Sequence, residues 1–314
     1  MSFIDLHCDT VYEMINKNIN LDSADLCVSA DKLKSAKALC QCFALYINLA
    51  DHNSNEECWQ RVLNMYELFE RETALRSDRI LVARSAADIE RAATQQKTAA
   101  LLTVEEGGIC GESLERLEQL YGMGVRMITL TWNYENAIGF PNSADPAALR
   151  KGLKPFGFEF IENMQRLGMI IDVSHLSEGG FWDVVKHSRK PFVASHSNAK
   201  SICNVSRNLT DEQLKALANS GGVTGINFYP NFLGSDQTGS IEQMISHIRH
   251  IKKVAGIDTV AIGSDFDGYD IPAELKDAAD LPKFAEALQK AGFTADEVEK
   301  ICWKNALRVF KEVL

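Results

Sequence analysis

Histidines and carboxylates stand at the ends of short apolar runs, in spacings that suit metal binding. In the first run, FIDLHCDT, His7 and Asp9 are two residues apart, so in a strand both side chains would point to the same side. Later runs end in the same way, with Glu105 and Glu106, Asp172 and His175, His196, and Asp265 and Asp267. Imidazole and carboxylate donors without thiolates suit zinc, and also manganese. These residues predict metal-assisted hydrolysis.

Five of these side chains are enough to hold two divalent ions that share one carboxylate. The ligands we predict are His7, Asp9, Glu106, His175 and His196, with Zn²⁺ as the metal. Two ions with a bridging ligand lower the pKa of a water held between them and clamp a reacting carbonyl. We favour Glu106 as the shared ligand because it precedes Gly107 and Gly108, which permit a close backbone approach, and because alternation should turn Glu105 away.

The remaining polar residues at the run ends suggest an acid/base and a substrate anchor. Asp265 is the predicted acid/base, which would take a proton from the attacking water, and Asp267 is its alternative. Arg207 follows His196 by eleven residues and could bind a carboxylate with its forked guanidinium. A surface ion pair between Arg207 and Asp211, at helical spacing, explains this arginine equally well from the residues alone.

A purely structural explanation exists for each of these residues singly. Each acidic residue could cap the helix that follows it, and the serines in DVSHLSE and ASHSNAK could do the same. This explanation would have to hold independently at five run ends. The joint metal-site hypothesis is therefore preferred.

The elements that would gather these side chains are eight β-rich runs with helical stretches between them. The runs cover residues 3–10, 38–49, 98–106, 126–133, 169–175, 191–197, 221–229 and 259–268, and clear helical periodicity covers 56–76, 113–123, 156–168, 211–220 and 240–256. Nearly continuous apolar runs are typical of parallel strands that are buried on both faces. We predict an α/β fold, a (β/α)8 TIM-type barrel, with residues 1–314 as a single domain.

The main competing fold is a doubly wound open sheet, which usually has a glycine-rich phosphate turn after its first strand, and this chain has no such turn there. Two long loops, at 137–155 and around 222–240, follow the fourth and seventh runs. In a barrel they would lie at the mouth where the polar run ends converge.

Composition excludes several classes of partner. The net charge is −10, without a stripe of Lys and Arg, which argues against nucleic acid and against an anionic membrane surface. We find no signal-like segment and no apolar run of 18 residues, so we expect a cytoplasmic protein. The eight cysteines lack zinc-ribbon or disulfide-scaffold spacing and are expected to be reduced.

The motifs DLHCDT, TVEEGG, DVSH, ASHSNAKSICNVSRN, INFY, GSDFDG and KNALRVF together resemble those of the membrane dipeptidase (renal dipeptidase) family, over nearly the whole chain. The resemblance implies a zinc dipeptidase on an amidohydrolase-like barrel, with the same five metal ligands. It also implies that Arg207 holds the substrate's C-terminal carboxylate, that Asp265 is the acid/base and that Tyr229 lines the pocket. Dipeptide substrates, with a D-residue accepted at the C-terminal position, and a homodimer are further implications.

One position departs from the family pattern. Trp132 in LTWN stands where family members typically place a histidine that contacts the substrate. Losing that donor weakens oxyanion stabilisation unless Asn133 or the ions replace it. Hydrolysis of another amide, a lactone or a cyclic imide on the same two-ion barrel therefore stays open as the alternative. A barrel without turnover, used for binding, is disfavoured by the complete set of ligands and the acid/base.

Overall fold

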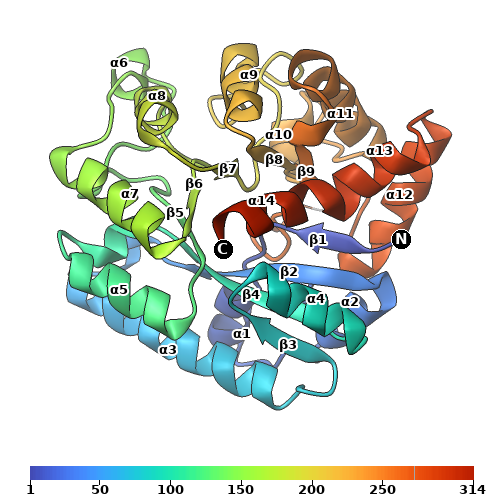
Figure 1. Ribbon diagram of the computed structural model, residues 1–314, viewed down its shortest axis with the longest axis horizontal. Helices are drawn as coiled ribbons and strands as arrows, with labels where there is room; N and C mark the ends of the chain where they lie inside the picture. The colour runs from blue at the N-terminus through green and yellow to red at the C-terminus, as the bar shows by residue number, and fades with distance from the viewer. Residues whose placement is uncertain (272) are drawn as a thin grey trace.

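The computed structural model contains a closed barrel of eight parallel strands enclosed by helices (Figure 1). It describes residues 1–271 and 273–314. The ring runs in the order β1, β2, β4, β5, β6, β7, β8, β9 and back to β1. Its strands are β1 Phe3–Asp5, β2 Ala38–Tyr46, β4 Thr98–Glu105, β5 Met127–Thr129, β6 Ile170–Asp172, β7 Val193–Ala194, β8 Val223–Ile226 and β9 Val260–Ile262. The predicted (β/α)8 barrel is confirmed, and each of the eight predicted runs contributes one strand.

One strand was not among the predicted runs. β3, Ile80–Ala83, pairs with the first half of β4, at Thr98–Leu101, while β5 pairs with its second half, at Thr103–Glu105. Because β2 occupies the other edge of β4, β3 and β5 share one edge in succession. β3 therefore extends the wall at the amino-terminal end of the strands, called the lower end below. It takes no part in closing the ring.

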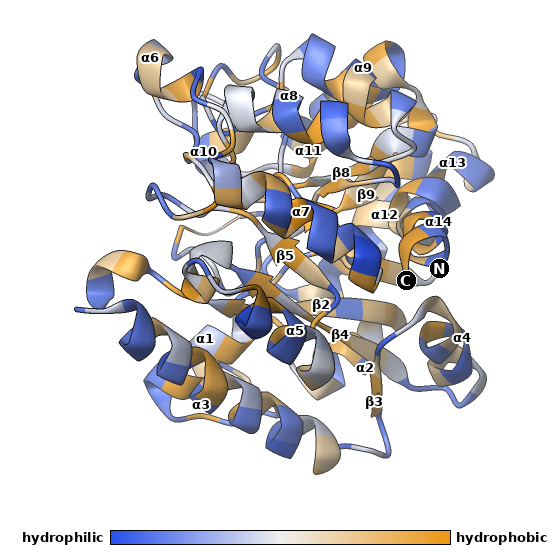
Figure 2. Cartoon of the chain, turned by 60° about the vertical axis from the view of Figure 1, so that its left-hand side comes forward, coloured by the Kyte–Doolittle hydropathy of each residue, from blue (hydrophilic) through white to orange (hydrophobic). Residues whose placement is uncertain are grey.

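The helices pack around the barrel with their polar faces outward, as the hydropathy colouring in Figure 2 shows. They are α1 Thr10–Lys17, α2 Ala30–Ala36, α3 Asn55–Ala74, α4 Ala86–Thr94, α5 Leu114–Met123, α6 Pro146–Leu149, α7 Pro155–Leu167, α8 Glu178–His187, α9 Asp211–Asn219, α10 Pro230–Leu233, α11 Ile241–Ala255, α12 Leu281–Lys290, α13 Ala295–Glu299 and α14 Asn305–Val313, with a π-helical turn at Lys300–Lys304. Several begin at a serine or threonine whose side chain accepts from the first turn, and α9 and α11 begin with full capping boxes.

The apolar core has two parts, one inside the barrel and one between the barrel strands and the helices. One cluster takes residues from every strand of the ring, namely Ile4, Cys40 and Cys42, Ala99 and Leu101, Met127, Ile170, Val193, Val223 and Ala261, and continues into α14. The other cluster contains Leu102 and Val104, from the opposite face of β4, and packs them against the helices. The first cluster fills the barrel and α14 closes its lower end, which leaves the polar chemistry at the carboxyl ends of the strands.

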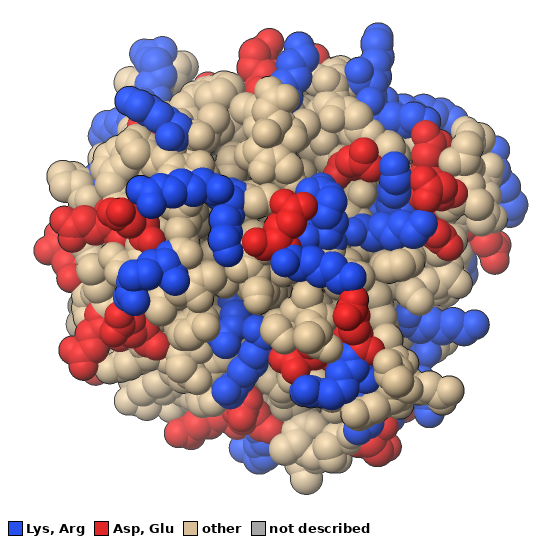
Figure 3. All heavy atoms as spheres, viewed as in Figure 1, with Lys and Arg blue, Asp and Glu red and all other residues tan. Residues whose placement is uncertain are grey.

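The surface and the cysteines agree with the composition. On the face seen in Figure 3, Lys and Arg alternate with Asp and Glu, and no large patch of one sign is visible there. None of the helices in the described part of the chain combines the length and the apolar composition needed to cross a bilayer. All eight cysteines are free thiols.

Asn305 connects α14 to the lower end of the barrel. Its side-chain amide is buried and donates to the carbonyl oxygens of Ile257 and Val260, both at 2.8 Å. This contact accounts for the asparagine in the KNALRVF motif.

Replacing Asn305 with Ala should destabilise the protein without altering the site. We expect Asn305→Ala to lower the free energy of unfolding by about 2 kcal/mol, since two buried carbonyls lose their donor. Urea denaturation measures the loss, and the exposed Glu312→Ala on the same helix is the matched control. Equal midpoints for the two variants would contradict this role.

Candidate metal centre

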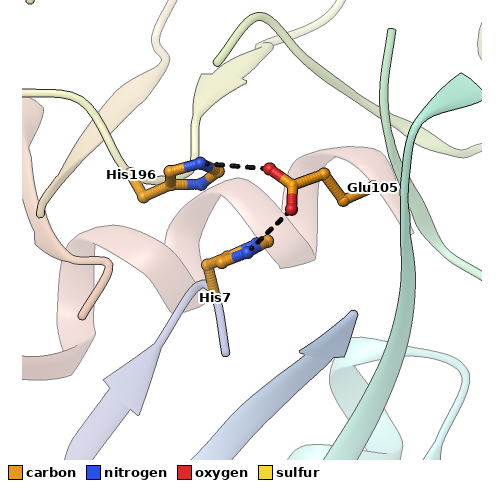
Figure 4. Close-up of side chains that lie close together, drawn as sticks. All are labelled: His7, Glu105 and His196. Carbon is orange, nitrogen blue, oxygen red and sulfur yellow. Dashed lines mark ion pairs between the residues drawn. The ribbon is translucent and has the colours of Figure 1, made fainter. Parts of the chain in front are cut away.

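Three imidazoles surround the carboxylate of Glu105 at the mouth of the barrel. Figure 4 shows the carboxylate, at the end of β4, between His7, which follows β1, and His196, which follows β7. Glu105 Oε1 lies 3.2 Å from His175 Nε2 and 3.3 Å from His196 Nε2, while Oε2 lies 3.4 Å from His7 Nε2. The two histidine nitrogens on the Oε1 side are 3.0 Å apart. One carboxylate therefore faces two separate groups of donor atoms.

The second group forms around His7. Its Nε2 lies 3.3 Å from Asp9 Oδ2 and 3.8 Å from Asp265 Oδ1, in addition to Glu105. Four of the five predicted ligands, His7, Asp9, His175 and His196, are thus brought together.

In place of the fifth predicted ligand, Glu106, the structure brings Glu105 to these side chains. Glu105 is on the same face of β4 as Ala99 and Leu101, which belong to the cluster filling the barrel. Glu106 follows the opposite face, and its carboxylate accepts hydrogen bonds from the backbone of Gly108 and Trp132 and from the Asn136 amide. The alternation argument was sound, but the phase of the alternation was assigned wrongly. Gly108 serves close packing, since a Cβ there would lie 2.6 Å from Asn136 Cβ.

Burial sets the protonation of this cluster. It lowers the pKa of His175 to about 4 and that of His196 well below its ordinary value, so both imidazoles are neutral and offer lone pairs at pH 7. Burial raises the pKa of Asp9 to about 7 and also raises the pKa of Asp265.

His7 and Glu105 depart from this trend because they face each other. Burial lowers the pKa of His7, but Glu105 and Asp9 outweigh it and hold that pKa well above its ordinary value. Burial raises the pKa of Glu105, but the charge of His7 and the closeness of the three imidazoles bring it well below its ordinary value. The carboxylates at the mouth thus favour positive charge beside them.

Three buried atoms at the mouth test whether the residues fit a metal. Among the described residues, His7 Nε2, Asp9 Oδ1 and Glu105 Oε1 have no hydrogen-bond partner. Leaving a buried polar atom unpaired costs about 1–3 kcal/mol, so such atoms normally have a function. Converging imidazole nitrogens and carboxylate oxygens are the donors that zinc binds in hydrolases. The residues fit a divalent metal.

The helix-capping alternative fails for Asp9 but holds for Ser177 and for Glu106, whose side chain caps the short turn at Gly107–Cys110. Asp9 is the N-cap residue of α1, but within the described residues its side chain makes no capping hydrogen bond. Ser177, two residues after His175, caps α8 by accepting from Gly180. The histidine beside that serine is left available.

Asp265 and Asp267 have different surroundings. Asp265 accepts one hydrogen bond, from the Asn227 amide to Oδ2 at 2.9 Å, and its Oδ1 faces His7. Asp267 accepts from the Thr10 hydroxyl at 2.6 Å and from the backbone of Cys27 and Val28 at 2.7 and 3.2 Å. Asp267 therefore anchors the segment before α2, and Asp265 is the carboxylate with a free oxygen.

Arg207 is buried beside the centre. Its Nη1 donates to Ser197 Oγ at 3.0 Å and its Nη2 to the His196 carbonyl at 3.1 Å, while Nε is buried and has no partner among the described residues. Asp211 pairs instead with His250, at 2.7 Å. The alternative of a surface ion pair between Arg207 and Asp211 is wrong.

A cavity of about 560 Å³ opens at the mouth of the barrel, and Arg207 is not among the described residues that line it. Tyr229 and Trp132 line it together with Asp9, Glu105, His175 and Asp265. The Trp132 ring packs edge-on against Tyr46, with centroids 5.0 Å apart. Asn133 also lines the cavity, and its Oδ1 lies 3.1 Å from His175 Nδ1, so this amide oxygen orients the imidazole.

The backbone is strained at several of these positions. Glu106, His175, Asp265 and Asp267 all have positive φ, between 63° and 104°. Residues other than glycine rarely adopt this region, and such strain concentrates at functional sites, where the surroundings enforce it. The chain thus turns sharply after β4, β6 and β9 to aim side chains at the mouth.

The whole chain, residues 1–314, matches the sequence model described as membrane dipeptidase (peptidase family M19). The chain belongs to the membrane dipeptidase family. The resemblance inferred from the motifs is confirmed, and the protein is a metal-dependent dipeptide hydrolase.

Individual relatives of this M19 protein agree over most of their length. A Klebsiella pneumoniae relative, an uncharacterised protein in the pqqA 5′ region, is 39% identical over 266 residues, which are 81% of this chain and 95% of that protein. The structure of dipeptidase AC, an M19 metallopeptidase, has a TM-score of 0.92 at 26% identity and covers 100% and 98% of the two chains. A Rhodobacter sphaeroides metallopeptidase, solved with a phosphinate mimic of L-Ala-D-Ala, has a TM-score of 0.92 at 24% identity and coverages of 100% and 99%.

Exchanging each glutamate of the pair for glutamine distinguishes their roles. Glu105→Gln should lose bound metal, because it removes the charge facing both donor groups, whereas Glu106→Gln should keep its metal and lose stability. Metal analysis after dialysis, with thermal unfolding of each variant, gives both readouts. Metal loss confined to Glu106→Gln would reverse the assignment.

Proposed function

We propose that this dipeptidase uses two divalent ions, most suitably Zn²⁺, which His7, Asp9, Glu105, His175 and His196 would hold. The observation that supports this is the division of donor atoms between the two oxygens of one carboxylate. His175 Nε2 and His196 Nε2 face Oε1, whereas His7 Nε2, with Asp9 beside it, faces Oε2. When bound, such ions supply a nucleophilic water at neutral pH and polarise the peptide carbonyl.

Asp265 is the proposed general acid and base. Asn227 holds its Oδ2, which leaves Oδ1 directed toward the His7 side of the centre. Burial raises the pKa of this carboxyl, which improves its ability to accept a proton from the attacking water and return it to the leaving amine.

Arg207 is the proposed anchor for the substrate's C-terminal carboxylate. Its buried Nε–H has no partner among the described residues, and with a hydrogen remaining on a terminal nitrogen it can form the forked contact that carboxylates favour. A fixed anchor beside the centre restricts cleavage to short peptides.

The side chains above the ions set the shape of the substrate site. Trp132, packed on Tyr46, forms an aromatic wall and supplies no imidazole donor to the oxyanion. The bound L-Ala-D-Ala mimic in the Rhodobacter sphaeroides structure supports a C-terminal D-residue in the substrate.

A panel of L,L and L,D dipeptides, each compared with its C-terminal amide, tests the substrate class and the anchor together. The zinc-loaded enzyme should hydrolyse dipeptides and discriminate against the amides. Arg207→Lys should raise KM for dipeptides about 10- to 100-fold, as expected for a lost charged hydrogen-bond pair, and should reduce that discrimination. Ser197→Ala, which removes one partner of the guanidinium but leaves its charge, is the control.

No amino-acid release from any dipeptide by folded protein with two bound ions would overturn the proposal. Faster release from N-acyl amino acids or lactones would favour the alternative hydrolase. An unchanged preference for free carboxylates in Arg207→Lys would remove Arg207 from the substrate site.

Asp265→Asn separates proton transfer from metal binding. We expect kcat to fall by about 10²- to 10⁴-fold, the usual contribution of a positioned acid/base, while both ions stay bound. Metal analysis and kinetics on the same sample measure both properties. The matched variant Asp267→Asn should lower the melting temperature and reduce kcat much less, because its partners belong to the α1 and α2 segments. A larger loss of kcat in Asp267→Asn would exchange the two roles.

A further inference from the structure

Beneath the metal centre lies a fully buried carboxylate that is not a ligand. Asp172, the last residue of β6, accepts four hydrogen bonds: from the Ser174 and Ser195 backbone amides to Oδ1, at 3.0 and 2.8 Å, and from the Thr129 and Ser195 hydroxyls to Oδ2, at 2.6 and 2.5 Å. Each oxygen thus accepts two donors. Asp172 has no oxygen left for a metal, although it stands in the row of acids at the strand ends.

Ser195 connects this carboxylate to a ligand histidine. Its hydroxyl oxygen lies 2.5 Å from Asp172 Oδ2 and also 2.7 Å from His196 Nδ1. A hydroxyl has one hydrogen to donate. Since a carboxylate can only accept, that hydrogen belongs to Asp172, and the contact with His196 must then be a donation from Nδ1–H to the serine oxygen.

We propose that Ser195, backed by Asp172, is a positioning residue that holds His196 as its Nδ1–H tautomer, so that the lone pair stays on Nε2. Nε2 is the atom that faces Glu105 Oε1 and His175 Nε2. A partner on the far ring nitrogen is the usual means by which proteins orient a metal-binding histidine. Here that partner is Ser195, which donates its own hydrogen to Asp172 on the neighbouring strand.

The backbone around Ser195 is packed too closely to shift. A Cβ at Gly225 would lie 2.0 Å from the Ser195 carbonyl oxygen, and one at Gly263 would lie 1.8 Å from it. Positions 225 and 263 must therefore be glycine for these two segments to lie so close to the Ser195 backbone. The Ser195 hydroxyl is thereby held at hydrogen-bonding distance from His196 Nδ1.

A second aspartate–serine pair in the same barrel shows which part of the Asp172–Ser195 arrangement is structural. Asp5 accepts from the Ser264 amide at 2.8 Å and the Ser264 hydroxyl at 2.6 Å, the same paired contact that Ser195 makes with Asp172. Asp5 pairs in register with Ile262, which belongs to the helix-side cluster, and the hydrogen bonds of Ser264 involve no imidazole among the described residues. Both aspartate–serine pairs thus join strand ends. The Ser195 pair differs from the Ser264 pair because its serine also contacts a histidine ring.

The proposal depends on the two-ion function, but its first test does not. Long-range proton–nitrogen correlation spectra of metal-free protein with ¹⁵N-labelled histidine report each tautomer, and His196→Asn identifies the resonance. We expect His196 to carry its proton on Nδ1 in the wild type. A proton on Nε2 would overturn the proposal, whatever the activity of the enzyme. Conversely, absence of dipeptidase activity would overturn the function and leave this result intact.

Two substitutions around Asp172 supply the matched comparison. Ser195→Ala and Thr129→Ala each remove one hydroxyl from Asp172 Oδ2, but only Ser195 contacts His196. Ser195→Ala should move the His196 proton toward Nε2 and weaken zinc binding about 10- to 100-fold, the usual effect of losing such a partner. Thr129→Ala should lower the melting temperature and keep both the tautomer and the zinc affinity.

If the His196 tautomer and the zinc affinity are the same in the two variants, Ser195 is only a structural residue and the proposal is wrong. If Ser195→Ala does not fold, the wild-type spectrum decides by itself.

Discussion

The number of hydrogen-bond donors that the chain supplies to each buried carboxylate determines what that carboxylate does. A buried charge is costly unless donors or counter-charges surround it. Asp5 and Asp172 each receive four donors from the protein, and Glu106 and Asp267 each receive three. Such acids are satisfied within the fold and join strand ends or loops to it.

The remaining acids at the mouth are left short of donors. Asp9 and Glu105 each keep a buried oxygen without a partner in the described chain, and Asp265 has one amide donor. Glu105 also has the neutral imidazoles of His175 and His196 beside it, whose lone pairs add to the demand for positive charge. The barrel thus builds a centre that cations complete, on a base of acids that the protein has already satisfied.

The architecture makes this division possible. Parallel strands end together at one mouth, so side chains far apart in the sequence become neighbours there, while α14 and the apolar layer close the other end. The turns that aim His175 and Asp265 use a strained backbone conformation, which close packing and hydrogen bonds enforce. Rigid strands, a satisfied lower layer and strained upper turns together preorganise the side chains at the mouth.

Local patterns along the chain, such as the apolar runs, the family motifs and the His-x-Asp spacing, were enough to predict the barrel, the family and four of the side chains that meet at the mouth. The choice between neighbouring acids depends on contacts between distant segments of the fold. Glu106 is satisfied by Trp132 and Asn136, and Asp267 by Cys27 and Val28, which are 26 or more positions away in the chain. The burial of Arg207 and the contact of Ser195 with Asp172 likewise depend on neighbouring strands. Strand alternation states that adjacent side chains point opposite ways, but the packing of the closed sheet selects which one points inward.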